Sequence, residues 1–158
     1  MRKARSGHII SISSLAGLAG FEFNAAYAAS KFGLEGWMES LRFDVAPFGI
    51  KTIIVDPGFF RTELLEPEST FYAQLSIDDY AERNEQFKNF FKEKNRNQEG
   101  DPVKLAKALI TIASQEEPPA RFIAGTDAIA GAEQKVAELQ QQINAYRDLS
   151  TSLAYEDA

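Results

Sequence analysis

The feature that most restricts the fold is a pair of β-branched runs on either side of one long amphipathic segment. Residues 9–12 (IISI) and 51–55 (KTIIV) are each typical of a buried strand. Between them, apolar residues recur at three-to-four spacing over 25–45 and predict a helix, which Pro47 and Gly49 end. A helix that joins two strands in this way predicts a right-handed crossover and a parallel sheet.

Later segments continue this α/β pattern. Asp101 is a helix cap, Pro102 takes the first helical position, and the predicted helix runs to Ser114. Residues 121–125 (RFIAG) predict a third strand. The buried side of the helix is predicted to consist of Leu105, Ala106, Leu109, Ile110 and Ala113.

The last predicted helix, over 126–149, carries apolar residues at alternating spacings of three and four. Such a seam packs against a second helix or along its own domain. Packing along its own domain is the favoured interpretation. Pairing between two copies, which would make the protein a homo-oligomer, stays open as the alternative.

Composition excludes several classes of partner. The 158 residues are enough for one domain, and a net charge of -6 at pH 7 leaves no basic stripe for a nucleic acid. No apolar run reaches the length that spans a membrane, so no membrane partner is expected. The sequence has no cysteine, which removes disulfides, a thiolate nucleophile and a zinc-finger type of metal site. No metal is therefore expected, and the composition fits a cytoplasmic location.

Three side chains near the first strand suggest proton-transfer chemistry. Ser14 follows the strand, and Tyr27 and Lys31 lie four residues apart on one face at the head of the predicted helix. A cation within a few ångströms of a phenol favours its ionised form. Tyr27 could therefore act as a general acid in a reduction and as a base in an oxidation, while Ser14 holds a substrate oxygen within reach. A Tyr and a Lys at this spacing also occur on helix surfaces with no joint role.

The residues around this pair resemble the active-site segment of the short-chain dehydrogenase/reductase family. The motif Ser-Ser-x-x-Gly stands at 13–17 and the motif Tyr-x-Ala-Ser-Lys at 27–31. In the family the catalytic serine lies thirteen residues before the tyrosine, which selects Ser14 over Ser13. Residues 57–62 look like the family's Pro-Gly-x-x-x-Thr turn, which carries the nicotinamide end of the cofactor.

This resemblance implies an NAD(P)-dependent oxidoreductase that transfers hydride between the cofactor and a carbonyl or alcohol substrate. Tyr27 would be the general acid and base, and Ser14 and Lys31 the other catalytic residues. The residues implied to bind NAD or NADP, with no preference between the two, are Tyr27, Lys31, Pro57, Gly58, Phe60 and Thr62.

The fold implied is a partial Rossmann-like, doubly wound parallel sheet of about three strands, with flanking helices and a C-terminal helical extension. Residues 1–125 correspond to the C-terminal half of a dehydrogenase domain, 126–150 to the C-terminal helix and 151–158 to a frayed tail. The family's Gly-x-x-x-Gly-x-Gly turn is absent. We therefore expect a truncated chain that is inactive by itself. The alternative is an inactive half-domain that serves as a dimerisation or interaction module.

Residues 63–100 are predicted to form a lid-like insertion over the cofactor site. Ser76 or Asp78 would cap a helix within it, and plain packing of that helix on the core is compatible with the same pattern. The aromatic residues of that helix region are Tyr80, Phe87, Phe90 and Phe91. An apolar mouth, which favours an apolar small-molecule carbonyl or alcohol, would be lined by Phe59, Phe60, Leu64 and Leu65.

Overall fold

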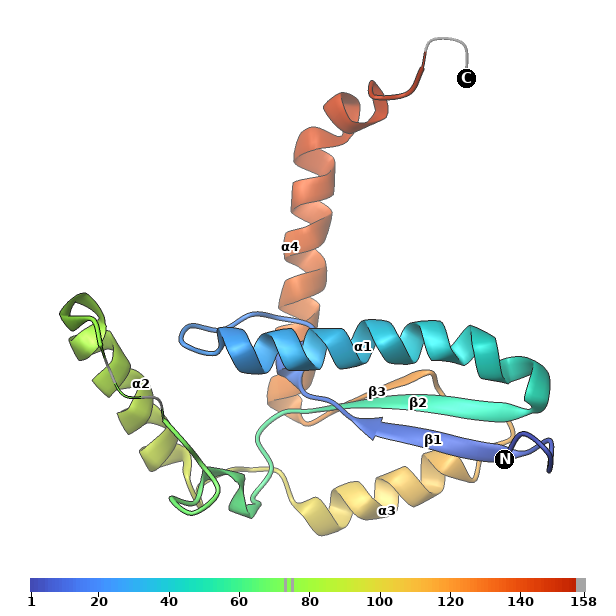
Figure 1. Cartoon of the computed structure of the whole chain (residues 1–158), viewed down its shortest axis with the longest axis horizontal. Helices are drawn as coiled ribbons and strands as arrows, with labels where there is room; N and C mark the ends of the chain where they lie inside the picture. Colours follow the sequence, from blue (N-terminus) through green and yellow to red (C-terminus); the bar gives the residue numbers. More distant parts are fainter. Residues whose placement is uncertain (73, 75, 156–158) are drawn as a thin grey trace.

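The computed structural model describes residues 1–72, 74 and 76–155 (Figure 1). Its three strands are β1 (Gly7–Ile12), β2 (Ile50–Pro57) and β3 (Arg121–Ala124). They form one parallel sheet in the order β1-β2-β3, so β2 is central and β1 lies at an edge. The predicted parallel α/β sheet of three strands is confirmed.

Helices cover both faces of this sheet. Helix α1 (Ala25–Val45) lies on one face and α3 (Pro102–Ala113) on the other (Figure 1). The apolar core lies between the sheet and α3, where Ile53 and Val55 of β2 pack with Ile112. The Asp101 carboxylate accepts from the backbone N–H groups of residues 103 and 104, which confirms the predicted cap.

The predicted buried side of α3 is partly wrong. Ile110 is 68% exposed and Ala106 is exposed, whereas Ile112 is buried. The spacing rule placed Ile110 on the inner side together with Leu109. Only one of these adjacent side chains can face the sheet, and Leu109 packs against the core.

Helix α1 begins and ends where the sequence predicted. The 3-10 turn Ala46–Phe48 follows α1, and Gly49 ends this turn with a φ of 67°, a left-handed conformation that favours glycine. Its buried residues are Ala28, Glu35 and Met38. The three-to-four spacing of apolar residues over 25–45 includes Trp37 next to Met38, but Trp37 is 56% exposed. The inner side of α1 is thus rotated toward a charged residue, Glu35.

Helix α2 (Ala81–Lys94) belongs to the predicted insertion and stands to one side of the sheet (Figure 1). It follows a 3-10 turn, Asp78–Tyr80, and no side chain caps it. The helix is therefore present as predicted, but the side-chain cap expected from Ser76 or Asp78 is not made.

Helix α4 (Thr126–Thr151) projects away from the sheet on the side of α1 (Figure 1). Ala128 and Ala132 are buried, but every residue from 136 to 155 is exposed. The prediction that this helix packs along its own domain is therefore wrong beyond its first turns. Of the predicted frayed tail, residues 156–158 lie outside the described part of the chain. Among the helices described, none has both the length and the apolar character required to cross a membrane.

Candidate active site

The carboxyl ends of β1 and β2 lie side by side. Ile12 pairs with Val55, and the Ser13 backbone N–H donates to the Val55 carbonyl oxygen over 2.7 Å. Ser14 and the turn that starts at Pro57 therefore leave the sheet at the same edge. In open α/β sheets, ligands bind outside this edge.

Tyr27 and Lys31 stand above this edge in the first turns of α1. The Lys31 Nζ lies 5.6 Å from the centre of the Tyr27 ring, so the predicted pairing on one helix face is confirmed. The same Nζ donates to the Ile12 carbonyl oxygen at 3.1 Å, which ties α1 to the end of β1. Tyr27 is 37% exposed, so its ring is open to an incoming molecule.

Ser14 caps the short 3-10 turn Leu15–Gly17. Its Oγ accepts from the Ala16 backbone N–H at 3.2 Å, which leaves the hydroxyl proton free to be donated. Within the described part of the chain, no hydrogen bond links Ser14 to Tyr27 or Lys31. The end of β1 connects Lys31 to the segment that carries Ser14, because Ser14 follows Ile12 by two residues and the Ile12 carbonyl oxygen accepts from Lys31.

The turn after β2 is held by an acidic residue that sequence reasoning missed. The Gly58 backbone N–H donates to the Ala124 carbonyl oxygen at 2.9 Å, and the Phe59 N–H donates to Asp127 Oδ2 at 2.7 Å. A Cβ atom on Gly58 would lie 2.1 Å from Asp127 Oδ1. Any larger residue here would therefore have to displace the Asp127 carboxylate. In the sequence, Asp127 is visible only as an acidic residue in the first turn of a helix. That position by itself indicates stabilisation of the helix and no contact with the turn after β2.

Phe60 and Thr62, also in the predicted cofactor set, belong to a neighbouring turn. Phe60 pairs with Gly100, whose carbonyl oxygen accepts from the Arg61 N–H at 2.8 Å. The Thr62 Oγ1 accepts from the Leu64 N–H at 3.4 Å. No hydrogen bond of the described residues joins this turn to Ser14, Tyr27 or Lys31.

A buried ion-pair cluster lies beneath the site and was also missed. Arg121 of β3 donates to Asp56 Oδ2 at 2.7 Å, to Glu39 Oε1 at 2.9 Å and to Glu35. Asp56 has no exposed surface and Glu35 is almost fully buried. Gly17 makes room for this cluster, because a Cβ there would lie 2.7 Å from Glu35 Oε1.

Burial is the main cause of an altered protonation equilibrium in this cluster. Together with the nearby Glu35 carboxyl, it raises the pKa of Asp56 from 3.8 to about 7, against the opposing effect of Arg121. The cluster joins α1, β2 and β3 directly under the edge where the site lies. Over residues 1–72, 74 and 76–155, no group of three or more His, Cys, Asp or Glu side chains is placed to hold a metal ion.

An aromatic cluster flanks the site and connects it to α2. Phe59 lies 6.1 Å, centre to centre, from both Phe90 and Phe91. Phe23, four residues before Tyr27, lies 5.8 Å from Phe87. The turn after β2 and the loop before α1 thus both contact α2. Phe23 was not predicted as part of the site, since it lies in a loop without a periodic pattern. Leu64, which was predicted to line the mouth, is exposed.

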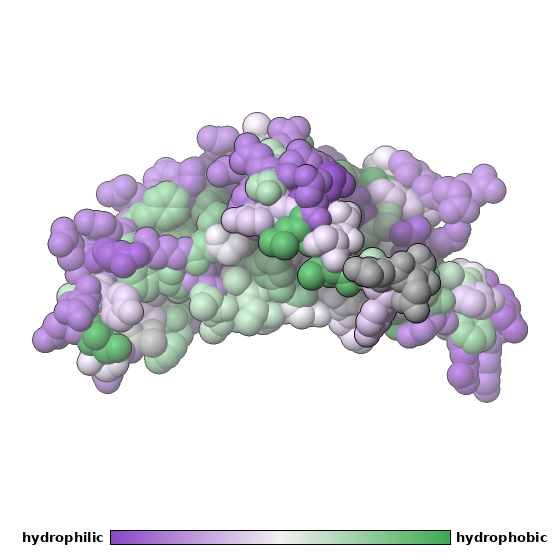
Figure 2. Space-filling model, turned by 90° about the horizontal axis from the view of Figure 1, so that it is seen from above, coloured by the Kyte–Doolittle hydropathy of each residue, from purple (hydrophilic) through white to green (hydrophobic). Residues whose placement is uncertain are grey.

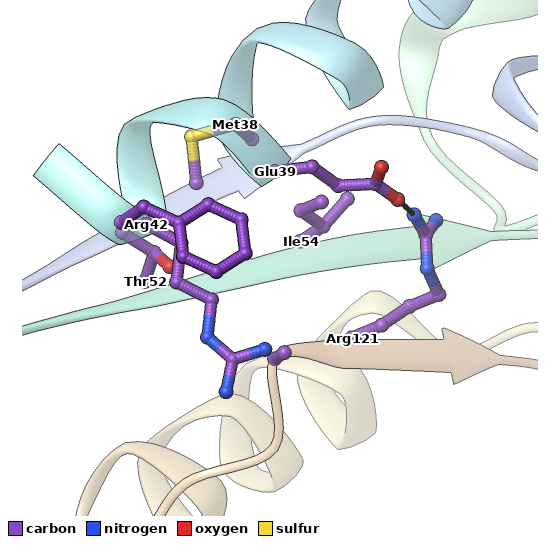
Figure 3. A pocket seen from close by; sticks show the side chains of 8 residues that line it. Met38, Glu39, Arg42, Thr52, Ile54 and Arg121 are labelled. Atoms are coloured by element: carbon purple, nitrogen blue, oxygen red, sulfur yellow. Dashed lines mark hydrogen bonds and ion pairs between the residues drawn. The ribbon is translucent and has the colours of Figure 1, made fainter. Parts of the chain in front are cut away.

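A hollow on the α1 face of the sheet is separate from this site. Figure 3 shows Met38, Arg42 and Ile54 around it, with the ion pair between Glu39 and Arg121 at its margin. Ser14, Tyr27, Lys31 and the turn after β2 do not line it.

The sequence matches known proteins over most of its length. A family model described as short chain dehydrogenase matches residues 1–73. The 3-ketodihydrosphingosine reductase of Bacteroides thetaiotaomicron is 37% identical over 125 residues, which are 79% of this chain and 46% of that protein. The chain thus spans about half the length of the curated relatives it matches.

Solved structures agree with the sequence comparison. A short-chain dehydrogenase from Streptomyces avermitilis is 32% identical and superposes with a TM-score of 0.83, covering 98% of this chain and 55% of that one. A short chain dehydrogenase from Burkholderia cenocepacia, solved in complex with NADP, shares the fold with a TM-score of 0.59 at 20% identity. The match covers 90% of this chain and 48% of the Burkholderia cenocepacia chain.

Proposed function

The chain belongs to the short-chain dehydrogenase/reductase family, and we propose that it carries the proton-transfer residues of an NAD(P)-dependent oxidoreductase. The observation that carries this proposal is the position of Lys31. Its ammonium lies beside the Tyr27 ring and is hydrogen-bonded to the end of the strand that leads to Ser14.

Each of the three side chains has a distinct role in a carbonyl reduction. The Ser14 hydroxyl donates a hydrogen bond to the carbonyl oxygen and fixes its position. Tyr27 gives its phenolic proton to that oxygen as the carbonyl becomes an alcohol, and the phenolate left behind is stabilised by the Lys31 ammonium. In the oxidation of an alcohol, the phenolate takes the proton back.

The residues present fit the nicotinamide end of the cofactor. Lys31 uses one of its three donors on Ile12, so two remain for ribose hydroxyls. When bound, the nicotinamide supplies or accepts the hydride. Pro57 and Gly58 would border its ring at the end of β2, and Phe60 and Thr62 stay in the proposed set on the family pattern. The sequence has no Gly-x-x-x-Gly-x-Gly turn, so none of its residues is assigned to the pyrophosphate.

The aromatic cluster supports an apolar carbonyl or alcohol as the substrate. Phe23 and Phe59 flank the edge from which Tyr27 is reached, and both contact α2. Rings of this kind bury apolar surface and offer few polar groups. The relative from Bacteroides thetaiotaomicron is named for a sphingoid ketone, which agrees with such a mouth.

The test is a substitution at the proposed acid. Because the chain spans about half of its relatives, the assay uses a longer chimeric protein in which this chain replaces the matching part of the Streptomyces avermitilis relative. Tyr27→Phe removes only the phenolic hydroxyl group, and with it the proposed proton donor, so kcat should fall by at least about a hundredfold, the usual scale of acid–base catalysis. The Kd of NADPH, followed by cofactor fluorescence, should change little.

Two further variants make the test specific. Lys31→Ala should lower kcat and also weaken cofactor binding, since the same ammonium is proposed to hold the ribose. Tyr146→Phe on the projecting part of α4 is the matched control and should leave kcat unchanged. If Tyr27→Phe retains nearly normal turnover, the assignment of the acid is wrong.

A further inference from the structure

Helix α4 leaves a long apolar stripe in water. From residue 136 to the end of the helix at Thr151 every side chain is exposed, and no other described element covers them (Figure 1). Figure 2 views the molecule from the side to which α4 projects, and green apolar residues lie open on that face among purple hydrophilic ones. The large apolar members of the stripe are Ile129, Val136, Leu139, Ile143, Tyr146 and Leu149.

A projecting helix of this kind is incomplete by itself. At 1.5 Å per residue the sixteen residues of 136–151 extend roughly 24 Å beyond the body. Isolated helices of about this length are marginal in water, and most of their stability in proteins comes from packing of an apolar side. The length and the exposed stripe therefore indicate a helical partner.

The spacing of the stripe fits pairing with one other helix. Ile129, Val136 and Ile143 repeat every seven residues, and Ala132, Leu139 and Tyr146 form a second series between them. Two such series are the seam of a two-helix coiled coil. Ala132 is buried against the body, so the free part of the seam begins at Val136.

Charges beside the seam point to a second copy of the same helix. Glu133, Gln140 and Arg147 follow the second series by one residue and line one flank. We propose that two copies of this chain pair through α4 in antiparallel orientation, about a two-fold axis near Gln140. Each Glu133 then faces Arg147 of the partner subunit, so that the pairing makes two equivalent ion pairs.

A parallel arrangement lacks this complementarity. In parallel coiled coils one flank faces the other flank of the partner, and the opposite flank here consists of Ala128, Lys135, Gln142 and Leu149. Glu133 would then face an alanine, Lys135 a glutamine and Arg147 a glutamine. A two-fold antiparallel contact is also isologous, the commonest way in which identical subunits associate. The proposal concerns α4 alone and does not depend on the proposed catalysis.

Sedimentation equilibrium of the 158-residue chain tests the proposal. We expect a reversible dimer. Val136→Glu and Ile143→Glu should each raise the dimer Kd at least tenfold, because a carboxylate would enter the seam. Val103→Glu on α3 is the matched control, since Val103 is 61% and Val136 67% exposed, and it should leave the Kd unchanged. Circular dichroism confirms that each variant is folded.

Orientation is tested by charge reversal and by crosslinking. Arg147→Glu should weaken the dimer, and adding Glu133→Arg should restore it. The chain has no cysteine, so one introduced cysteine reports a single contact. Gln140→Cys, on the proposed axis, should form a disulfide between subunits, whereas Val136→Cys should not.

Four results would overturn the proposal. A monomer at the highest concentrations, or an association that survives both Val136→Glu and Ile143→Glu, would remove α4 from the interface. Crosslinking of Val136→Cys without that of Gln140→Cys would show parallel helices. In the longer chimeric protein, protection of α4 amides from hydrogen exchange in a monomer would show that the stripe is covered within one chain.

Discussion

At the scale of single residues, the buried cluster is the least expected feature. Asp56 and Glu35 lie in the interior because one guanidinium, that of Arg121, bonds to both. Among the residues that the structure describes, their second oxygens, Asp56 Oδ1 and Glu35 Oε1, have no hydrogen-bond partner. An interior that holds two acids with one base favours the retention of a proton.

The retained proton makes stability depend on pH. The pKa of Asp56 rises from 3.8 to about 7 in the folded state, so over this range the folded protein holds a proton that the unfolded chain releases. The free energy of unfolding should therefore fall as pH rises through this window, by up to roughly 1 kcal/mol per pH unit, and level off above it. Asp56→Asn, which cannot ionise, should remove this slope in urea unfolding followed by circular dichroism.

The matched control is Glu117→Gln. Glu117 pairs with Lys51 at the surface and should leave the slope unchanged. An unaltered slope in Asp56→Asn would assign the retained proton to another group.

Gly58 gives a second prediction for a single residue. The Cβ of Gly58→Ala would clash with the Asp127 carboxylate and displace its hydrogen bond to Phe59. The cost should be roughly 1–3 kcal/mol of unfolding free energy, the usual scale of overpacking. Gly20→Ala, where a Cβ meets nothing within 4 Å, is the control in the same urea titration. Equal effects of the two variants would contradict a specific clash.

At the scale of elements, α2 connects the two loops that border the site. Its Phe87 contacts Phe23 before α1, and its Phe90 and Phe91 contact Phe59 after β2. A single helix therefore fixes both sides of the proposed mouth. This arrangement is the basis for proposing that the described part of the predicted insertion, 63–100, acts as a lid.

If α2 acts as a lid, a substitution on it should change the KM for the substrate far more than the Kd of the cofactor. Phe90→Ala in the longer chimeric protein should raise the KM for an apolar ketone by roughly tenfold or more, because it removes apolar surface from the mouth. The Kd of NADPH should change much less. Phe43→Ala, exposed on α1 away from the mouth, is the control. If Phe90→Ala weakens substrate and cofactor binding equally and also lowers Tm, α2 serves only as packing for the rest of the domain.

The bounds of most elements could be predicted from the sequence, and the inner faces of the helices could not. Periodicity and caps are local signals, so α1 and the Asp101 cap were found correctly. Glu35 faces inward because it pairs with Arg121, which lies 86 residues away in the sequence. Asp127 likewise accepts from Phe59, which lies 68 residues away. Neither contact leaves a local pattern. Tyr27 and Lys31 were paired correctly because their contact depends on helix geometry alone.

At the scale of the whole molecule, two surfaces favour association. The first is the edge of the sheet: among the described strands, β1 and β3 each pair on one side only, and unpaired strand edges invite other chains. The α4 stripe is the second surface. Because they lie on different elements, substitutions on α4 distinguish them.

The isolated chain should not bind the cofactor tightly. Without a glycine-rich turn it lacks the donors that hold a pyrophosphate, and the positioning that such binding provides lowers the reaction barrier. Titration of the 158-residue chain with NADPH and NADH, followed by cofactor fluorescence, should show no saturable binding below roughly the millimolar range. Micromolar binding by a monodisperse monomer, sized by light scattering, would refute this expectation.

The outward position of Trp37 has an optical consequence. It is the one tryptophan of the sequence, and its indole is already in contact with water in the folded protein. Its emission should therefore shift little on denaturation, and iodide should quench it in the native state. A molecule that covers the outer side of α1 would move the emission to shorter wavelength. The intrinsic fluorescence of this protein thus reports what touches that helix rather than whether the chain is folded.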